Sequence, residues 1–376
     1  MKQSILFFTV LIFLLPGCNE KPAMSNGIRI DIDRETKDVS IFDLFEKIEI
    51  IPLETTDESL IKEIYKIVYH NDNFYILDYG LGKIIVFDKD GKFRFTIDQR
   101  GQGPGEYLHI ADFDVDRDSN RVLIVDPTGA KLLDYDADKG RFMKKTSLPE
   151  LEGGAYNRIK YLNPKLIAFW TFDYKNRLKL YSRSSNRFIN ESFPEEESLY
   201  TRLGTPVFPY SSFITRPVDN NVYEITPEGD VSIAYSWDFG KLNIDPDKLF
   251  YPSEKELQQK FREYMEKARA SEIVNYFFGA SGGNETYLYT VIIRKNRGLH
   301  LFYNKETKEH LLFEKTKEQA YLYPCIWTED FITGIIPNVD MILPLPDAIL
   351  DAENLEKKRK RKEDDNPVLI KYYFKK

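Results

Sequence analysis

The chain has 376 residues, of which 42% are hydrophobic and 30% charged, and its formal net charge is −7. This composition favours solubility, and the acidic balance argues against a nucleic-acid partner, which would require a basic surface. Two cysteines are too few for a disulfide framework, so stability must come from a hydrophobic core.

The first residues are typical of a bacterial export signal. Lys2 provides the positive start, and residues 5–15 form an apolar run that is too short for a stable membrane anchor. The sequence Leu-Pro-Gly then precedes Cys18, an order that resembles a lipobox, in which the cysteine is lipidated. An ordinary secretory signal with an incidental cysteine is the alternative. We therefore expect a signal peptide at 1–17, a polar tether at 18–40 and a folded region at 41–376.

Two segments, 74–91 and 122–140, repeat one pattern. Each has a β-rich run that ends in Asp, a polar break, a Lys, a second β-rich run that ends in Asp, and a Gly turn. Asp78, Lys83 and Asp88 all recur 48 residues later. A period of about 40–50 residues made of short strands and turns predicts an all-β fold, the β-propeller.

Alternating apolar positions and turn residues place six blades along the chain. Residues 42–53 are expected to complete the sixth blade beside 367–374, which joins the two ends of the chain and removes exposed strand edges. Five or seven blades are the alternatives, because the later repeats are degenerate. The expected blades lie at about 64–98, 110–148, 156–193, 205–240, 274–316 and from 320 onward, with a further strand at 27–32 and helical insertions at about 245–272 and 347–363.

Several segments resemble the six-bladed β-propeller lipoproteins of Bacteroides-type bacteria, a family related to the NHL-repeat propellers. The resemblance is strong in the first two blades and weaker from 150 to 320. It implies a lipid-anchored envelope protein near outer-membrane glycan-uptake systems, and it implies no particular reaction. The carriers are ILD and VFD with DG in 76–91, GQGPGEY at 101–107, DVD and VLIVD in 114–126, IPLETTDESLIKEI at 51–64 and NPVLIKYYFK at 366–375.

The segment RGQGPGEY, residues 100–107, invites comparison with a phosphate-binding loop. A phosphate loop needs a following helix, whereas this segment lies between two blades and precedes a strand. We therefore interpret it as an inter-blade turn with Pro104 and glycines at its bends. Its polar side chains Arg100, Gln102 and Glu106 are candidates for ligand binding at the mouth of the central channel.

Asp112, Asp114, Asp116 and Asp118 alternate along one segment, as oxygen ligands of calcium do. The glycine and glutamate that an EF-hand loop requires are missing, so we expect a strand whose carboxylates face one way, followed by a hairpin turn at 118–120. The four histidines, at 70, 109, 300 and 310, show no metal-ligand spacing. The sequence predicts neither a metal nor a cofactor.

Aromatic side chains suggest a glycan platform, because sugars stack on aromatic faces. Trp170, Tyr174 and Trp237 are the candidates, and packing between blades is the alternative for each. The GASGG run at 279–283 differs from a hydrolase nucleophile turn and is expected to be a flexible hairpin loop. Cys325 is expected to be a buried hydrophobe, and the basic run 357–362 a solvated helix face.

These features predict an exported, lipid-anchored binding or assembly module without catalytic activity, in the outer membrane. An envelope protein or a glycan would be its partner, with no nucleic acid. A glycan lyase or hydrolase at the channel mouth is the alternative. A cluster of His, Tyr, Arg and Glu on one loop face would favour the enzyme, and an apolar patch on the inserted helices would favour a protein partner.

Overall fold

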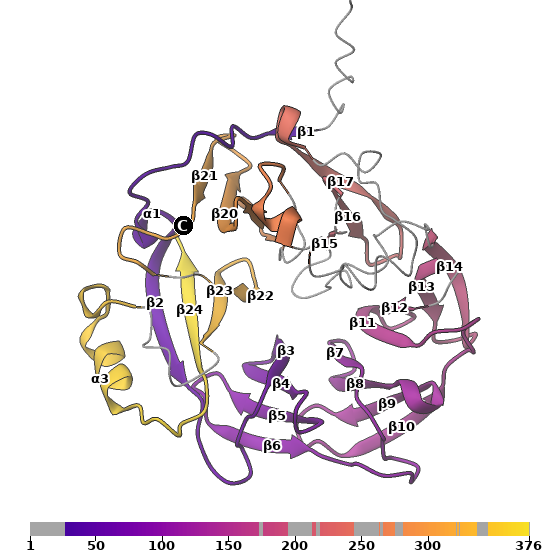
Figure 1. Ribbon diagram of the computed structural model, residues 1–376. Coiled ribbons are helices and arrows are strands. Elements are labelled where there is room, and N and C mark those ends of the chain that lie inside the picture. Colours follow the sequence, from indigo (N-terminus) through magenta and orange to yellow (C-terminus); the bar gives the residue numbers. More distant parts are fainter. Residues whose placement is uncertain are drawn as a thin grey trace, which may run out of the picture.

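In the computed structural model, six four-stranded sheets stand in a ring around a common central axis, as in a six-bladed β-propeller (Figure 1). The predicted fold class is thus confirmed. The structure describes residues 27–172, 176–194, 213–215, 219–243, 263, 266–274, 281–320, 322, 324–336 and 345–375. In this part of the chain, none of the helices has the length and apolar character that a bilayer crossing requires.

The first three blades are four-stranded meanders, each with its first strand nearest the centre of the ring (Figure 1). Blade 1 contains β3 (Ile64–His70), β4 (Asn73–Asp78), β5 (Lys83–Asp88) and β6 (Phe93–Ile97). Blade 2 contains β7 (Asp112–Asp116), β8 (Arg121–Asp126), β9 (Lys131–Asp136) and β10 (Phe142–Ser147). Blade 3 contains β11 (Tyr156–Asn163), β12 (Leu166–Thr171), β13 (Asn176–Ser182) and β14 (Arg187–Pro194).

Of the other three blades, two take their outermost strand from the N-terminal part of the chain. Blade 4 contains β15 (Phe213–Thr215), β16 (Asn221–Ile225), β17 (Val231–Asp238) and the parallel strand β1 (Gly27–Arg29). Blade 5 contains β18 (Ser281–Gly283), β19 (Tyr287–Arg294), β20 (Arg297–Asn304) and β21 (His310–Phe313). Blade 6 contains β22 (Pro324–Trp327), β23 (Phe331–Ile336), β24 (Val368–Phe374) and β2 (Phe45–Pro52).

The ring closes as predicted, because β2 pairs antiparallel with β24 from Phe45↔Phe374 to Pro52↔Val368. The expected strand at 42–53 begins later than predicted, since the one-turn helix α1 (Ile41–Leu44) precedes it. Ser40 and Asp43 cap this turn reciprocally, in a capping box that satisfies backbone N–H groups at the helix start.

Residues 27–40, which the sequence assigned to a tether, form a belt along the outer rim of blades 4 to 6. After β1, the amide of Thr36 donates to the carbonyl of Leu312 in blade 5 at 2.8 Å, and the carbonyl of Val39 accepts from the amide of Lys317. The belt then enters α1 and β2 (Figure 1). The N-terminal segment thus connects three blades from the outside.

The described residues form six hydrophobic clusters. Each cluster fills the interface between two neighbouring blades. In β4, Tyr75 and Leu77 pack toward blade 2, whereas Phe74 and Ile76 pack toward blade 6. Each central strand therefore buries both faces, which explains the continuous apolar runs of the repeats. The core is a ring of equivalent inter-blade layers.

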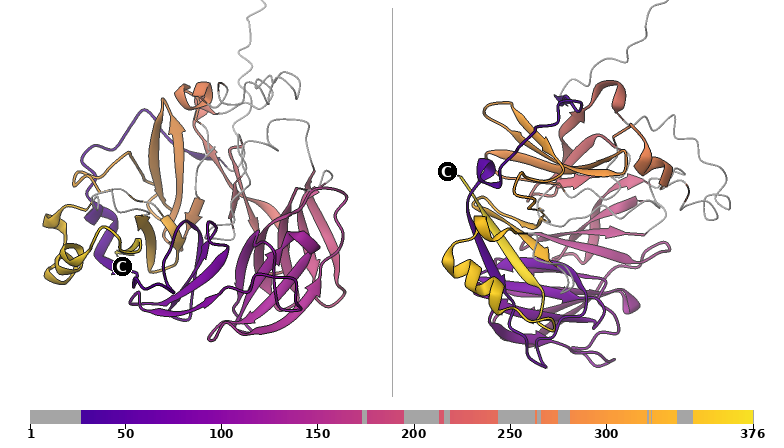
Figure 2. Two further views of the ribbon diagram at one scale, coloured as in Figure 1. Left: turned by 60° about the horizontal axis from the view of Figure 1, so that its bottom comes forward. Right: turned by 60° about the vertical axis from the view of Figure 1, so that its left-hand side comes forward.

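The two predicted helical insertions are described in part. Of 245–272, the structure describes 263 and 266–272, and residues 266–270 are helical. In the second insertion, a short 3-10 turn, η5 (Asp347–Ile349), precedes α3 (Ala352–Lys360), which lies against the outside of β2 (Figure 2). Asn354 of α3 accepts from the amide of Ile50 at 2.7 Å and donates to the carbonyl of Ile48. This side chain bonds the free edge of the outermost strand.

Candidate functional site

Each meander divides its turns between the two faces of the ring. We call the face with the inter-blade connections and the turns between second and third strands the connection face. The opposite face, with the turns between first and second strands, is the turn face. The innermost strands β15, β18 and β22 contain no charged residue, whereas β3, β7 and β11 contain several. Among the described innermost strands, charged side chains therefore belong to blades 1 to 3.

The carboxylates of β7 face blade 3, as the alternation predicted. Asp112 accepts from the amide of Ile159 at 2.9 Å, and Asp114 accepts from the amide of Tyr161 at 2.7 Å. These amides belong to β11, whose inner edge has no neighbouring strand. The two side chains therefore satisfy backbone donors that a further strand would otherwise bond.

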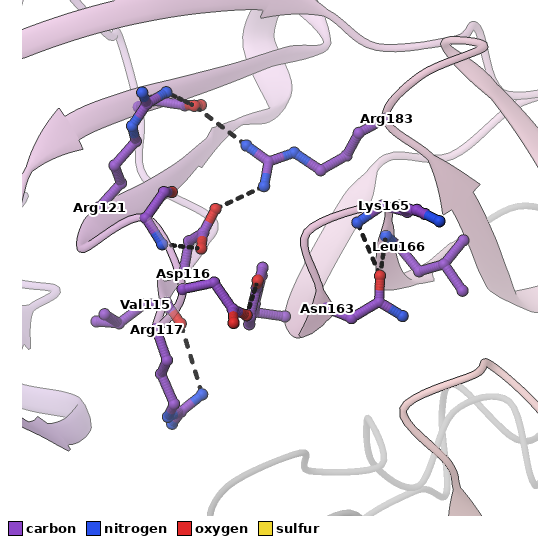
Figure 3. Close-up of polar contacts among 12 residues, drawn as sticks. Val115, Asp116, Arg117, Arg121, Asn163, Lys165, Leu166 and Arg183 are labelled. Atoms are coloured by element: carbon purple, nitrogen blue, oxygen red, sulfur yellow. Dashed lines mark hydrogen bonds and ion pairs between the residues drawn. The ribbon is translucent and has the colours of Figure 1, made fainter.

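At the turn face, four residues link blades 2 and 3 (Figure 3). Arg183 donates to Asp116 at 2.6 Å and to Asp134 at 3.3 Å, and Arg121 also donates to Asp134. Burial raises the pKa of Asp134, and the two arginines only partly offset that effect. For Asp116, burial is outweighed by hydrogen bonds from Ser119 and Arg183, which lower the pKa. The balanced charges identify this network as a structural link.

A second polar group joins the innermost strands β3, β7 and β11. The ammonium of Lys66 in β3 is 3.0 Å from a carboxylate oxygen of Asp112 and donates to the carbonyl of Ile159 at 3.4 Å. Lys66 and Asp112 are both buried. Blades 1 and 3 thus meet across the innermost strand of blade 2.

Half-buried Lys160 of β11 has no carboxylate within salt-bridge distance among the described residues. Burial lowers its pKa to about 8; Asp114 opposes the shift, and the positive charges of Arg117 and Lys66 add to it. Burial also acts on Asp114, but Lys66, Arg117 and Lys160 outweigh it and lower the pKa of this carboxyl. Figure 3 shows Arg117 turned away from Arg183, and its guanidinium donates to the carbonyl of Val115 at 3.5 Å.

On the connection face, four side chains form what we call the aromatic column. The rings of Tyr65 and Tyr79 stack with centroids 5.1 Å apart, and His109 meets Tyr79 edge-on at 5.6 Å. The guanidinium of Arg158 lies 4.7 Å from the centre of the Tyr65 ring. Tyr65 is 37% and Tyr79 46% exposed, unlike the aromatic residues of the inter-blade clusters. Burial raises the pKa of Tyr65, with Arg158 opposing it.

The aromatic column was not predicted from the sequence, although a signal was present. Tyr79 occupies the repeat position at which the second blade has Pro127, so a large aromatic replaces a turn residue there. Tyr65 and Arg158 lie on innermost strands, and His109 lies in the connection that enters β7. Their proximity depends on three blades and is not visible in any local spacing.

The loop with Arg100, Gln102 and Glu106 lies elsewhere. The carbonyl of Gly105 accepts from Tyr135 of β9, and Gly105 adjoins Phe142 of the outermost strand β10. The tip of the loop therefore lies over the outer strands of blade 2. Arg100 pairs with Asp98, and Glu106 accepts from the amide of Gly103 within the loop. Ligand binding by these three side chains stays a prediction.

The tryptophan candidates lie between blades. Trp170 is 5% exposed and packs with Phe193, and Trp237 is fully buried between blades 4 and 5. Neither presents an open ring face, which agrees with the packing alternative. Tyr174 lies outside the described residues.

Other motifs have structural partners. Cys325 is buried, and burial raises the pKa of its thiol. The end of the GASGG run is strand β18 rather than a flexible loop, and Ser281 contacts Thr290 at 3.2 Å. In the basic run, Lys357 and Lys360 pair with glutamates one turn earlier. Within the described ranges, no group of three or more His, Cys, Asp or Glu residues could hold a metal ion.

Comparison with known proteins identifies the family. The chain belongs to the family described as Domain of unknown function (DUF4934), whose sequence profile matches residues 27–373. A Bacteroides fragilis protein named as a candidate exported protein is 20% identical, has a TM-score of 0.68 and aligns over 93% of this chain and 99% of its own. A member of the duf4221 family from Bacteroides vulgatus is 12% identical, with a TM-score of 0.52 and coverage of 88% and 97%. No curated protein matches the sequence.

Proposed function

We propose that this chain is an exported, lipid-anchored binding module of the cell envelope, and that the aromatic column is its ligand surface. The exposed stack of Tyr65 and Tyr79 carries the proposal. Burial of large aromatic side chains is energetically favourable. An exposed stacked pair beside polar groups therefore favours a ligand with an apolar ring face.

A glycan fits this surface best. A sugar ring has an apolar face and an equatorial rim of hydroxyls. The tyrosine rings would contact the face, while the Arg158 guanidinium and the His109 imidazole would bond the hydroxyls. Such a ligand agrees with the glycan-uptake setting that the sequence resemblance implies.

Glycan binding can be tested with the mature chain. Calorimetry against a panel of neutral and acidic oligosaccharides, with and without EDTA, is expected to give saturable binding that EDTA leaves unchanged. Tyr79→Ala should weaken this binding at least about tenfold, the loss that follows when a stacking contact of about 1.4 kcal/mol is removed. Phe42→Ala, which removes another exposed aromatic side chain, on α1, is the matched control. Equal losses in both variants would contradict the proposal.

The lipid anchor has its own test. The signal-like segment and Cys18 lie outside the described residues, so the proposal depends on the sequence order Leu-Pro-Gly-Cys. Cys18→Ala is expected to move the protein from the membrane to the soluble fraction, while Cys325→Ala should leave it membrane-bound. Unchanged membrane retention of the first variant would refute lipidation at this site.

An envelope glycan lyase or hydrolase is the second candidate, and the contact between His109 and Tyr79 favours it. A histidine, two tyrosines and an arginine on one face provide proton donors and acceptors within reach of a bound sugar. Release of reducing ends or unsaturated sugars from a bound oligosaccharide would establish turnover. His109→Gln should then abolish turnover while leaving affinity within about twofold of the wild type. Binding without turnover would favour the non-catalytic module.

A further inference from the structure

Among the described residues, unpaired positive charge gathers on the inner side of blades 1 to 3, although the whole chain is acidic. Lys66, Arg117, Arg158 and Lys160 lie on this side of blades 1 to 3, and the carboxylates that accompany them are Asp112, Asp114 and Asp118, the last of which accepts from the Tyr161 hydroxyl. Asp116 is engaged by Arg183. The cations therefore outnumber the carboxylates available to neutralise them.

Three of these cations lack a carboxylate partner at salt-bridge distance among the described residues, namely Arg117, Arg158 and Lys160. Arg158 contacts the Tyr65 ring and the carbonyl of Asn157, and Arg117 contacts the carbonyl of Val115. Neutral contacts leave their charges uncompensated. An arrangement of this kind costs free energy in the empty protein and favours an anion that enters it.

We propose that Arg158, Lys160 and Arg117, which follow one another from the connection face to the turn face, bind successive acidic groups of an anionic oligosaccharide, one ring of which contacts the aromatic column. The inference rests on the proposed function, because it names the ligand class of the same surface. Arg158 belongs to both parts, since its guanidinium lies against Tyr65 and its strand also carries Lys160. A uronic acid unit combines the two required features, a stacking ring and a carboxylate.

The charge of Lys160 gives this proposal a distinctive readout. Asp114, Arg117 and Lys66 are the charged groups around it in the described part of the chain, and its pKa of about 8 places its titration in an accessible range. A bound anion would stabilise the ammonium and raise that pKa. Loss of the proton above pH 8 should therefore weaken anion binding, and binding at pH 8.5 should take up protons.

The test compares a galacturonate tetramer with its methyl ester, which has the same rings without the charges. Calorimetry should show at least about tenfold tighter binding of the acid form, the effect of one charge-assisted contact. Its affinity should fall about threefold from pH 8 to pH 9, as the ammonium deprotonates to a neutral amine that binds about tenfold less tightly. Proton uptake follows from repeating the titration in two buffers of different ionisation heat.

Variants separate charge from fold. Lys160→Met and Arg158→Met should each weaken binding of the acid form about tenfold, whereas Lys160→Arg should keep the affinity and lose the pH dependence. Lys145→Met, on the exposed outermost strand β10, is the matched control, and melting curves confirm folding of all four variants.

Three results would overturn the inference. Equal affinity for acid and ester, with binding still lost in Tyr79→Ala, would refute the anion site and leave the glycan-binding function standing. Inorganic sulfate that binds as tightly as the tetramer would indicate a simple anion site without a saccharide. Failure of every glycan to bind would refute the proposed function as well.

Discussion

His300 is expected to make the stability of this protein depend on pH between about 6.5 and 4. Its ring is 7% exposed in β20, and its Nδ1 lies 2.9 Å from the Tyr289 hydroxyl. The ring also packs between Tyr289 and Phe313, with centroids at 6.1 and 5.5 Å. Burial lowers the pKa of His300 to about 4. The folded protein thus holds this imidazole neutral where the unfolded chain would protonate it.

The magnitude follows from the difference between the two pKa values. The unfolded chain has an ordinary histidine pKa of about 6.5, so below that pH it binds a proton that the folded state refuses. The free energy of unfolding therefore falls with falling pH, by about 1.4 kcal/mol per pH unit and about 3 kcal/mol in total at pH 4. Above about pH 6.5 the imidazole is neutral in both states, so the protein has its full stability there.

Urea denaturation of the wild type and of His300→Gln, at pH 7, 6 and 5, measures this effect. Glutamine keeps a hydrogen-bonding side chain for Tyr289 but does not titrate, so the stability difference between the two proteins should shrink by about 2 kcal/mol from pH 7 to pH 5. Other groups affect both proteins alike and cancel in the difference. His310→Gln controls for replacement of a histidine in the same blade. A stability difference that stays constant with pH would refute the assignment of a neutral, buried His300.

Asp112→Ala should lower the free energy of unfolding by about 3–5 kcal/mol, because it leaves Lys66 buried without its carboxylate. Adding Lys66→Met should recover much of this loss. If urea denaturation instead gives additive losses for the two changes, the prediction is contradicted. Gly91→Ala should cost about 1–3 kcal/mol, since Gly91 has φ +83 and its Cβ would meet the carbonyl that ends β2, whereas Gly298→Ala should cost less. Asn366→Ala should cost about 2 kcal/mol, because its amide joins three buried or half-buried backbone groups near the ring closure; a change in the urea midpoint no larger than that of an exposed-site variant would contradict it.

The sequence predicted the blades where local pattern determines structure. The repeat at Asp78 and Asp126 follows from strand alternation and turn chemistry, and closure by 42–53 follows from the need to remove free edges. The strand at 27–32 was anticipated in β1, but its parallel pairing with β17 was not. Three residues carry too little periodicity to specify a partner two hundred residues away.

The candidate site was predictable only in part, for a similar reason. The one-sided order of the carboxylates on β7 follows from strand geometry alone. Their partners Lys66 and Ile159 come from other blades, as do the members of the aromatic column. Residues 46 to 93 positions apart meet because the ring brings innermost strands together. No spacing in the sequence encodes that convergence without the number and order of the blades.

The belt and the closure of blade 6 have a consequence for the order in which this molecule can mature. The Tyr373 hydroxyl of β24 bonds to Glu49 of β2, 324 residues earlier in the chain. Strand β2 therefore cannot pair until β24, the last strand, has been synthesised. Joining such distant segments costs about 5 kcal/mol of chain entropy, which only the completed sheet repays. If the chain crosses a membrane with its N-terminus first, the ring stays open until the carboxyl terminus has emerged. A chain that lacks its final ten residues would leave unpaired strand edges on β2 and β23, where other chains could associate.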